Sequence, residues 1–209
     1  MHAPFAQREH LGRPAPGIAE DLHIAEEEIE RAQAIIRDLL EFSRTSGAEI
    51  EHIDVNDLVQ RTVQLLQKYL QNNGVQVVTQ LGDIPSCAAN ANAMRQLLLN
   101  LLTNAVQAMP RGGELRLRTA RAGRDRIRLE VEDTGVGIAP ENLHRIFDPF
   151  YTTKAPGQGT GLGLSVVHSV VSRHGGDISV ESTPGTGTRF RIELPCPCHQ
   201  DRLPPTLAP

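Results

Sequence analysis

The sequence lacks three features that would each indicate a class of protein: a cysteine framework, a long apolar run and a large excess of one charge. Its three cysteines, Cys87, Cys196 and Cys198, are an odd number without the spacing of a disulfide framework, so we expect reduced thiols and a cytoplasmic location. No run of about 18 apolar residues or signal peptide is present, which predicts no membrane contact by this chain. A longer parent protein attached to a membrane is compatible with this prediction. A formal net charge of −4 gives no general attraction to nucleic acid.

What the sequence does contain is the composition of a folded protein, with 39% hydrophobic and 22% charged residues. Residues 1–17 hold three prolines and two glycines and should form an irregular leader. From Ile18 onwards apolar residues recur at alternating steps of four and three, which is typical of a helix in a coiled coil or bundle. We assign residues 18–46 to this helix. An ordinary amphipathic helix packed on its own domain is the alternative.

Residues 50–195 show the mixed pattern of an α+β domain. Apolar periodicity predicts helices over 55–71, 92–109 and 164–174 and strands over 75–81, 115–117, 127–131, 178–180 and 188–194. In the first of these helices, Leu58, Leu65, Leu66 and Tyr69 should face inwards. Arginines that alternate with apolar residues in the strands should lie on a solvated face of the sheet. These elements predict a two-layer sandwich, with one sheet and helices on one side, followed by an irregular tail over 196–209.

Three segments have the features of a nucleotide site. A glycine-containing turn at 133–137 follows a strand, a glycine-rich turn at 157–163 opens a helix, and Asn100 and Asn104 lie one helical turn apart. Glycine turns at helix starts present free N–H groups to phosphate. The order of the segments argues against a Rossmann fingerprint, and the lack of a Gly-Lys-Ser/Thr ending argues against a P-loop. The two asparagines suit a magnesium ion that phosphates also bind, or else they are polar residues that line the edge of a buried helix.

Four motifs in this region occur together in one known family. Asn100 to Ala108 resembles the N box of histidine kinases, and Asp133 to Ile138 resembles their first glycine box. The segment from Phe147 to Lys154 resembles the F box, and Gly159 to Leu164 resembles the second glycine box. Thr186-Gly187-Thr188 resembles a further element of the same fold. The resemblance covers about residues 50–195 and implies the ATP-binding sandwich that these kinases share with heat-shock chaperones and mismatch-repair ATPases.

The resemblance also assigns roles. It implies that ATP and Mg²⁺ are bound, with Asn104 as the magnesium ligand and Asn100 in support, and with Lys154 reaching the phosphates. Asp133 should receive the adenine amino group, and Phe147 and Phe150 should anchor a mobile lid over residues 152–159. The implied nucleotide-binding residues are Asp133, Gly135, Gly137, Ile138, Phe147, Phe150, Thr153, Gly159, Thr160, Gly161, Leu162, Gly163, Leu164 and Thr188.

Residues 31–44 resemble the second helix of the dimerisation and phosphotransfer hairpin of the same kinases. This implies a homodimer in the intact protein and a phosphorylated histidine on a first helix, whose motif has no match in this sequence. The implied reaction passes the γ-phosphoryl group of ATP to that histidine, for relay to an aspartate of a response-regulator receiver domain. We therefore expect this chain to bind ATP without phosphorylating its own histidines.

Two departures from related patterns bear on the reaction. Where chaperone and mismatch-repair ATPases place a glutamate that activates water, this chain has Asn100, so water is not the expected acceptor. Asn90 stands where the kinases have an acidic residue. Two alternatives stay open: a module that changes shape with nucleotide and signals without phosphoryl transfer, and an ATP-hydrolysing relative of the same fold.

Overall fold

The computed structural model describes residues 50–154 and 159–196. The leader over 1–17, the helix over 18–46 and the tail beyond Cys196 lie outside the described residues. In chain order, the elements are β1 (Glu51–Ile53), α2 (Val55–Leu65), α3 (Gln67–Asn72), β2 (Val75–Leu81), β3 (Cys87–Ala89), α4 (Ala91–Ala108), β4 (Gly113–Arg121), β5 (Arg126–Asp133), η1 (Pro140–Asn142), α5 (Gly163–Arg173), β6 (Asp177–Thr183) and β7 (Gly187–Pro195).

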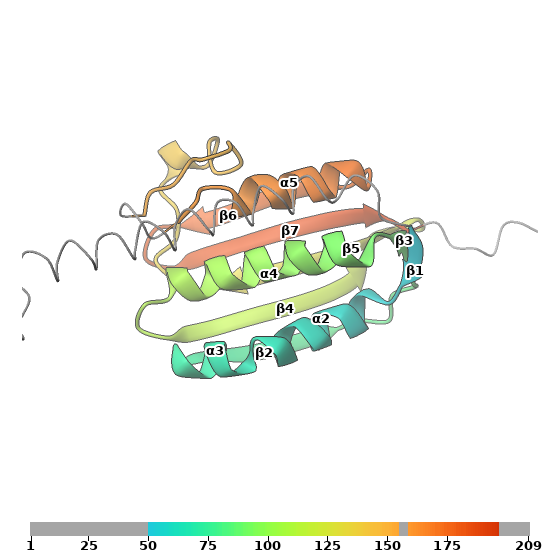
Figure 1. The fold of residues 1–209 in the computed structure, drawn as a ribbon, viewed down its shortest axis with the longest axis horizontal. Coiled ribbons are helices and arrows are strands. Elements are labelled where there is room, and N and C mark those ends of the chain that lie inside the picture. The colour runs from blue at the N-terminus through green and yellow to red at the C-terminus, as the bar shows by residue number, and fades with distance from the viewer. Residues whose placement is uncertain (1–49, 155–158, 197–209) are drawn as a thin grey trace, which may run out of the picture.

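A five-stranded sheet forms one layer, and the helices α2 to α5 form the other (Figure 1). The strand order is β2-β4-β5-β7-β6, in which β2 and β4 are parallel and the other neighbours antiparallel. Strands β4, β5 and β7 bury every second side chain, as a sheet covered on one face requires. The predicted α+β sandwich with helices on one side is therefore confirmed.

The uncovered face of the sheet carries the predicted arginine row, and glutamates of neighbouring strands pair with it. Arg118 Nη1 lies 2.7 Å from Glu132 Oε2, and Arg191 Nε lies 3.0 Å from Glu130 Oε1. These side chains are 15–32% exposed, so each pair contributes modestly to stability. The strand pattern predicted the face correctly but did not identify the partners.

Helix α4 lies at the centre of the helical layer, and its predicted bounds agree within one residue with the observed ones. Asn90 caps its first turn, because the side-chain Oδ1 accepts a hydrogen bond of 2.8 Å from the Ala93 N–H. Four leucines fill the interior, with side chains almost without solvent contact: Leu97, Leu98, Leu101 and Leu102. The helix is thus anchored along most of its length.

The single helix predicted over 55–71 is wrong in one respect. The chain breaks at Leu66, whose φ of −88° and ψ of 2° leave the helical region between α2 and α3. Leu65, the last residue of α2, is 67% exposed and Tyr69 in α3 is 38% exposed, although both were expected to face inwards. Leu70 takes the buried position in α3 instead.

The expectation of reduced thiols is also wrong for two of the three cysteines. Cys87 in β3 and Cys196, directly after β7, form a disulfide across a sequence separation of 109 residues. Both are buried, so Cys196 belongs to the packed domain and not to an irregular tail. Sequence spacing could not reveal the pair, because β3 is only three residues long and was not predicted. Among the described residues, no helix is long and apolar enough to cross a bilayer.

Candidate functional site

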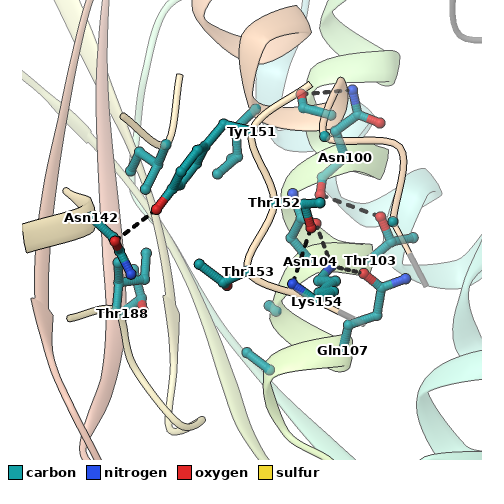
Figure 2. Close-up of a pocket in the computed structure, with 18 of the residues that line it drawn as sticks. Asn100, Thr103, Asn104, Gln107, Asn142, Tyr151, Thr152, Thr153, Lys154 and Thr188 are labelled. Carbon is teal, nitrogen blue, oxygen red and sulfur yellow. Dashed lines mark hydrogen bonds between the residues drawn. The ribbon is translucent and has the colours of Figure 1, made fainter. Parts of the chain in front are cut away.

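A cavity of about 640 Å³ opens between α4 and the segments that join β5 to α5. Segments far apart in the sequence meet there, as the labelled side chains in Figure 2 show. The lining includes most of the residues predicted to bind nucleotide or metal: Asn100, Asn104, Asp133, Gly137, Ile138, Thr153, Lys154, Gly159, Thr160, Gly161, Gly163, Leu164 and Thr188. The predicted motifs therefore converge on one site.

Asp133, at the end of β5, supplies a buried carboxylate to this cavity. Only 6% of the residue is exposed, and its Oδ1 accepts a 2.8 Å hydrogen bond from the Gly135 N–H. Burial raises the pKa of Asp133, and hydrogen bonds from the backbone of Gly135 and Thr188 act in the opposite direction. The result is an acceptor that is shielded from water and fixed in direction.

Thr188 stands next to Asp133, because the two residues are register partners in β5 and β7. Its hydroxyl lies 2.9 Å from Ser182 Oγ in β6, which also accepts a 2.8 Å hydrogen bond from the Ile138 N–H. This hydroxyl network ties the first glycine turn to the sheet. Ser182 was not identified from the sequence, since a serine in a strand carries no signal of its own.

Two glycines are required by close backbone approaches. Gly137 has φ of +71°, and an added Cβ would lie 2.2 Å from the Thr183 carbonyl oxygen. Gly161 has φ of +70°, and an added Cβ would lie 2.4 Å from the carbonyl carbon of Phe150. The two turns therefore pack against β6 and the F-box segment only with glycine at these positions.

The two asparagines of α4 have different surroundings. Asn100 Nδ2 donates to the carbonyl oxygen of Gly163 at 3.1 Å, and its Oδ1 accepts from Gln96 at 3.2 Å, so Asn100 ties α4 to the start of α5. Asn104 Oδ1 receives a longer 3.4 Å contact from Lys154 Nζ. An amide oxygen with so weak a protein partner fits a magnesium ion whose other ligands are phosphate oxygens and water.

Lys154 is the only basic side chain among the described residues of the lining, and Asp133 is the only acidic one. Burial lowers the pKa of Lys154, because its ammonium group is partly removed from water. Its hydrogen-bond acceptors are the amide oxygens of Asn104 and Gln107. Figure 2 shows these three residues on one side of the pocket and Thr188, the neighbour of Asp133, on the other. The cavity is thus polarised.

Four predicted residues do not line the cavity. Gly135 and Leu162 support the two turns, and Phe147 packs on the core with its ring 5.4 Å from that of His168. Phe150 is 64% exposed with φ of +66°, and its N–H donates to the Gly161 carbonyl at 3.0 Å. These four residues support the segments that line the cavity without lining it themselves. Of the expected lid, residues 155–158 lie outside the described residues.

Several lining residues were missed by the sequence reading. Tyr151 donates its hydroxyl to Asn142 Oδ1 at 2.7 Å, and the Arg145 guanidinium lies 4.4 Å from the centre of the Tyr151 ring. The remaining missed residues include Thr103, Gln107, Ile146 and Phe190. Helical periodicity could have indicated Gln107, because it lies three positions after Asn104 and therefore on the same face of α4.

Comparison with known proteins gives a family match that coincides with this site. Residues 89–197 match the family model described as histidine kinase-, DNA gyrase B-, and HSP90-like ATPase. The sensor histidine kinase ZraS of Salmonella typhi is 35% identical over 193 residues, which are 91% of this chain and 40% of that protein. The chain thus spans about two fifths of the length of the curated relatives it matches.

Two solved structures extend the comparison. The crystal structure of full-length ShkA in complex with AMPPNP has a TM-score of 0.73 and 25% identity, and the match covers 90% of this chain and 41% of that one. Histidine kinase ThkA in complex with the response regulator protein TrrA has a TM-score of 0.69 and 23% identity, with coverage of 90% and 53%. The second likeness concerns the fold alone.

Proposed function

Since this chain belongs to the family of histidine kinase-, DNA gyrase B- and HSP90-like ATPases, we propose that it is the ATP-binding catalytic domain of a sensor histidine kinase. It binds ATP with Mg²⁺ and delivers the γ-phosphoryl group to a histidine on a partner helix. The observation that carries this proposal is the polarised cavity, with the buried Asp133 carboxylate at one end and the Lys154 ammonium beside neutral amide oxygens at the other.

At the carboxylate end, Asp133 receives the exocyclic amino group of adenine. An acceptor fixed by the Gly135 N–H and shielded from water discriminates strongly, since a base with a carbonyl at that position would leave two acceptors facing each other. Thr188, held by Ser182, supplies a hydroxyl beside it. This end of the cavity therefore selects adenine over guanine.

At the cationic end, Asn104 holds the magnesium ion, and Lys154 with the N–H groups of the turn before α5 faces the phosphates. The metal supplies positive charge to the phosphate oxygens when it is bound. The protein's own contribution is to position the triphosphate and to neutralise its charge in a partly dehydrated site. Asn100 maintains the distance between α4 and α5 through its bond to Gly163.

The described lining also bears on which acceptor is used. Hydrolysis needs a group that activates water, and Asp133, the only carboxylate among the described lining residues, belongs to the adenine end. Transfer to the nitrogen of an incoming histidine makes no such demand on the cavity. This favours phosphotransfer over ATP hydrolysis.

The partners that we propose for the intact kinase are taken from its relatives. We propose that the acceptor histidine passes the phosphoryl group to an aspartate in the receiver domain of a response regulator, and that the intact kinase is a homodimer. ThkA has been solved with its response regulator, and its fold is similar to that of this chain. We propose a cytoplasmic location for this activity, because ATP and receiver domains are found there.

The test has two stages. Calorimetry should show ATP binding that Mg²⁺ strengthens, and the variant Asn104→Ala should lose most of that magnesium-dependent gain. A phosphotransfer hairpin of the parent kinase is then added with γ-labelled ATP. Acid-labile, base-stable label on the hairpin, with none on the histidines of this chain, is the expected result. Release of free phosphate would instead indicate the ATP-hydrolysing relative, and nucleotide-dependent hairpin binding without label would indicate an interaction module.

A further inference from the structure

The side chain of Lys154 crosses from the F-box segment to α4, where its ammonium group meets two neutral oxygens. One is Asn104 Oδ1 at 3.4 Å, and the other, at a shorter distance, is Gln107 Oε1. The role proposed above for Lys154 requires only that it face the phosphates. It leaves open what holds a long, flexible side chain there, since a lysine loses considerable rotamer freedom when it is fixed.

Resting on the proposed function, we propose that Gln107 is a positioning residue, which holds the Lys154 ammonium at the phosphate end of the cavity. Gln107 lies at the exposed rim of the cavity, three positions after Asn104 on the same face of α4. The two amides therefore form a pair of acceptors on a rigid helix. A helix fixed by a buried leucine core is a better reference point than the segment that carries Lys154.

The charge of the two acceptors matters. A carboxylate at position 107 would hold the lysine more strongly but would cancel the charge that the triphosphate needs. An amide oxygen fixes the direction of the ammonium and leaves its charge intact.

Lys154 can keep its contact with Gln107 when nucleotide binds, even if its contact with Asn104 is lost. An ammonium group has three N–H donors, and the two described acceptors use two of them. If Asn104 held a magnesium ion, the lysine N–H that now contacts Asn104 would be free for a phosphate oxygen, as would the third N–H, which the described contacts do not use. Gln107 keeps the remaining contact, so Lys154 stays in place through the exchange.

The experiment measures ATP and adenosine binding by calorimetry in four proteins: the wild type, Gln107→Leu, Lys154→Met and the double variant. Leucine retains helix propensity at this exposed position, so the fold should be preserved. Gln107→Leu should weaken ATP binding by about 3- to 10-fold, as loss of one hydrogen bond to a charged group at an exposed rim predicts, and leave adenosine binding unchanged. In the Lys154→Met background, the same substitution should have no further effect.

Two more variants sharpen the test. Gln107→Glu should weaken ATP binding at least as much as Gln107→Leu does, because the carboxylate neutralises the charge of Lys154 and repels the phosphates. Gln71→Leu makes the same exchange at an exposed position of α3 and should change nothing. Wild-type ATP affinity in Gln107→Leu, or an equal loss with and without Lys154, would overturn the inference. Absence of ATP binding in the wild type would instead overturn the proposed function.

Discussion

The two ends of α4 differ in how they are held and in what they contact. At its start, the preceding strand β3 is joined by a disulfide to the end of β7, and the side chain of Asn90 caps the first turn. At its last turns, Asn104 and Gln107 face an open cavity, and their contacts with Lys154 come from a loop segment. We call the first turn of α4 the closed end, because a disulfide fixes the strand before it, and the last turns the open end, because their side chains face the cavity. The polar side chains at the open end can therefore serve ligand binding, because the crosslink and the buried leucines hold the helix in place.

The contacts at the closed end explain why asparagine can stand at position 90, where the kinases have an acidic residue. Its side chain caps α4, and its backbone N–H donates to His174 Nε2 at 3.0 Å, while His174 Nδ1 contacts the Val170 carbonyl oxygen at 2.7 Å. The start of α4 is thereby tied to the end of α5. Asparagine and aspartate are similarly good N-caps, so the departure from an acidic residue preserves this function.

The largest expected effect comes from breaking the closed end. The double variant Cys87→Ala, Cys196→Ala should lose about 2–5 kcal/mol of unfolding free energy, since the crosslink restricts a long loop in the unfolded chain. Denaturant unfolding measures this, with reductant added to the wild type as a second way to remove the crosslink while the thiols are kept. ATP affinity at 25 °C should stay within a factor of about two, because the cavity lies at the other end. Identical unfolding of the wild type with and without reductant would show that the disulfide does not stabilise the domain.

At the open end, the largest effect should come from Asp133→Ala. Loss of a charge-assisted hydrogen bond to the adenine amino group, about 1.5–3 kcal/mol, predicts roughly 10- to 150-fold weaker ATP binding. Calorimetry with ATP and GTP measures it, and GTP binding should change far less. Unchanged ATP affinity would remove Asp133 from the adenine end.

Asp133 should also make the stability of the fold depend on pH. Its carboxylate favours ATP binding, but its burial should disfavour folding as pH rises. Because burial raises the pKa of Asp133 in the folded state, its favourable contribution is complete below the pKa of an unfolded aspartate, about 3.9, and is lost as pH rises through the folded value. Relative to low pH, Asp133 therefore makes folding less favourable at pH 7. Asp133→Asn should raise the unfolding temperature of the nucleotide-free protein at pH 7, and this gain should shrink as pH falls towards 4. A gain that is equal at both pH values would assign it to packing.

The sequence allowed the sheet and most of the site to be predicted, because both depend on local pattern. Alternating apolar residues identified β4, β5 and β7, and the two glycine turns supply residues that the structure places around one cavity. The failures involve information that is not local. The pairing of Cys87 with Cys196 depends on two segments 109 residues apart that meet only in the folded domain. The break at Leu66, where one helix was predicted, involves neither proline nor glycine, and Leu65 and Tyr69 on either side of it are exposed.

The smallest expected effect tests whether the two ends of α4 are independent. Asn90→Ala removes the cap from the Ala93 N–H and should cost about 1 kcal/mol of unfolding free energy, whereas Asn90→Asp keeps a capping oxygen and should cost much less. Neither change should alter ATP affinity, because the buried leucines of α4 separate this turn from Asn104. Denaturant unfolding and calorimetry on both variants measure the two quantities side by side. If Asn90→Ala weakened ATP binding as well, a loosened first turn would be transmitted along the helix, and the closed and open ends would have to be treated as one coupled unit.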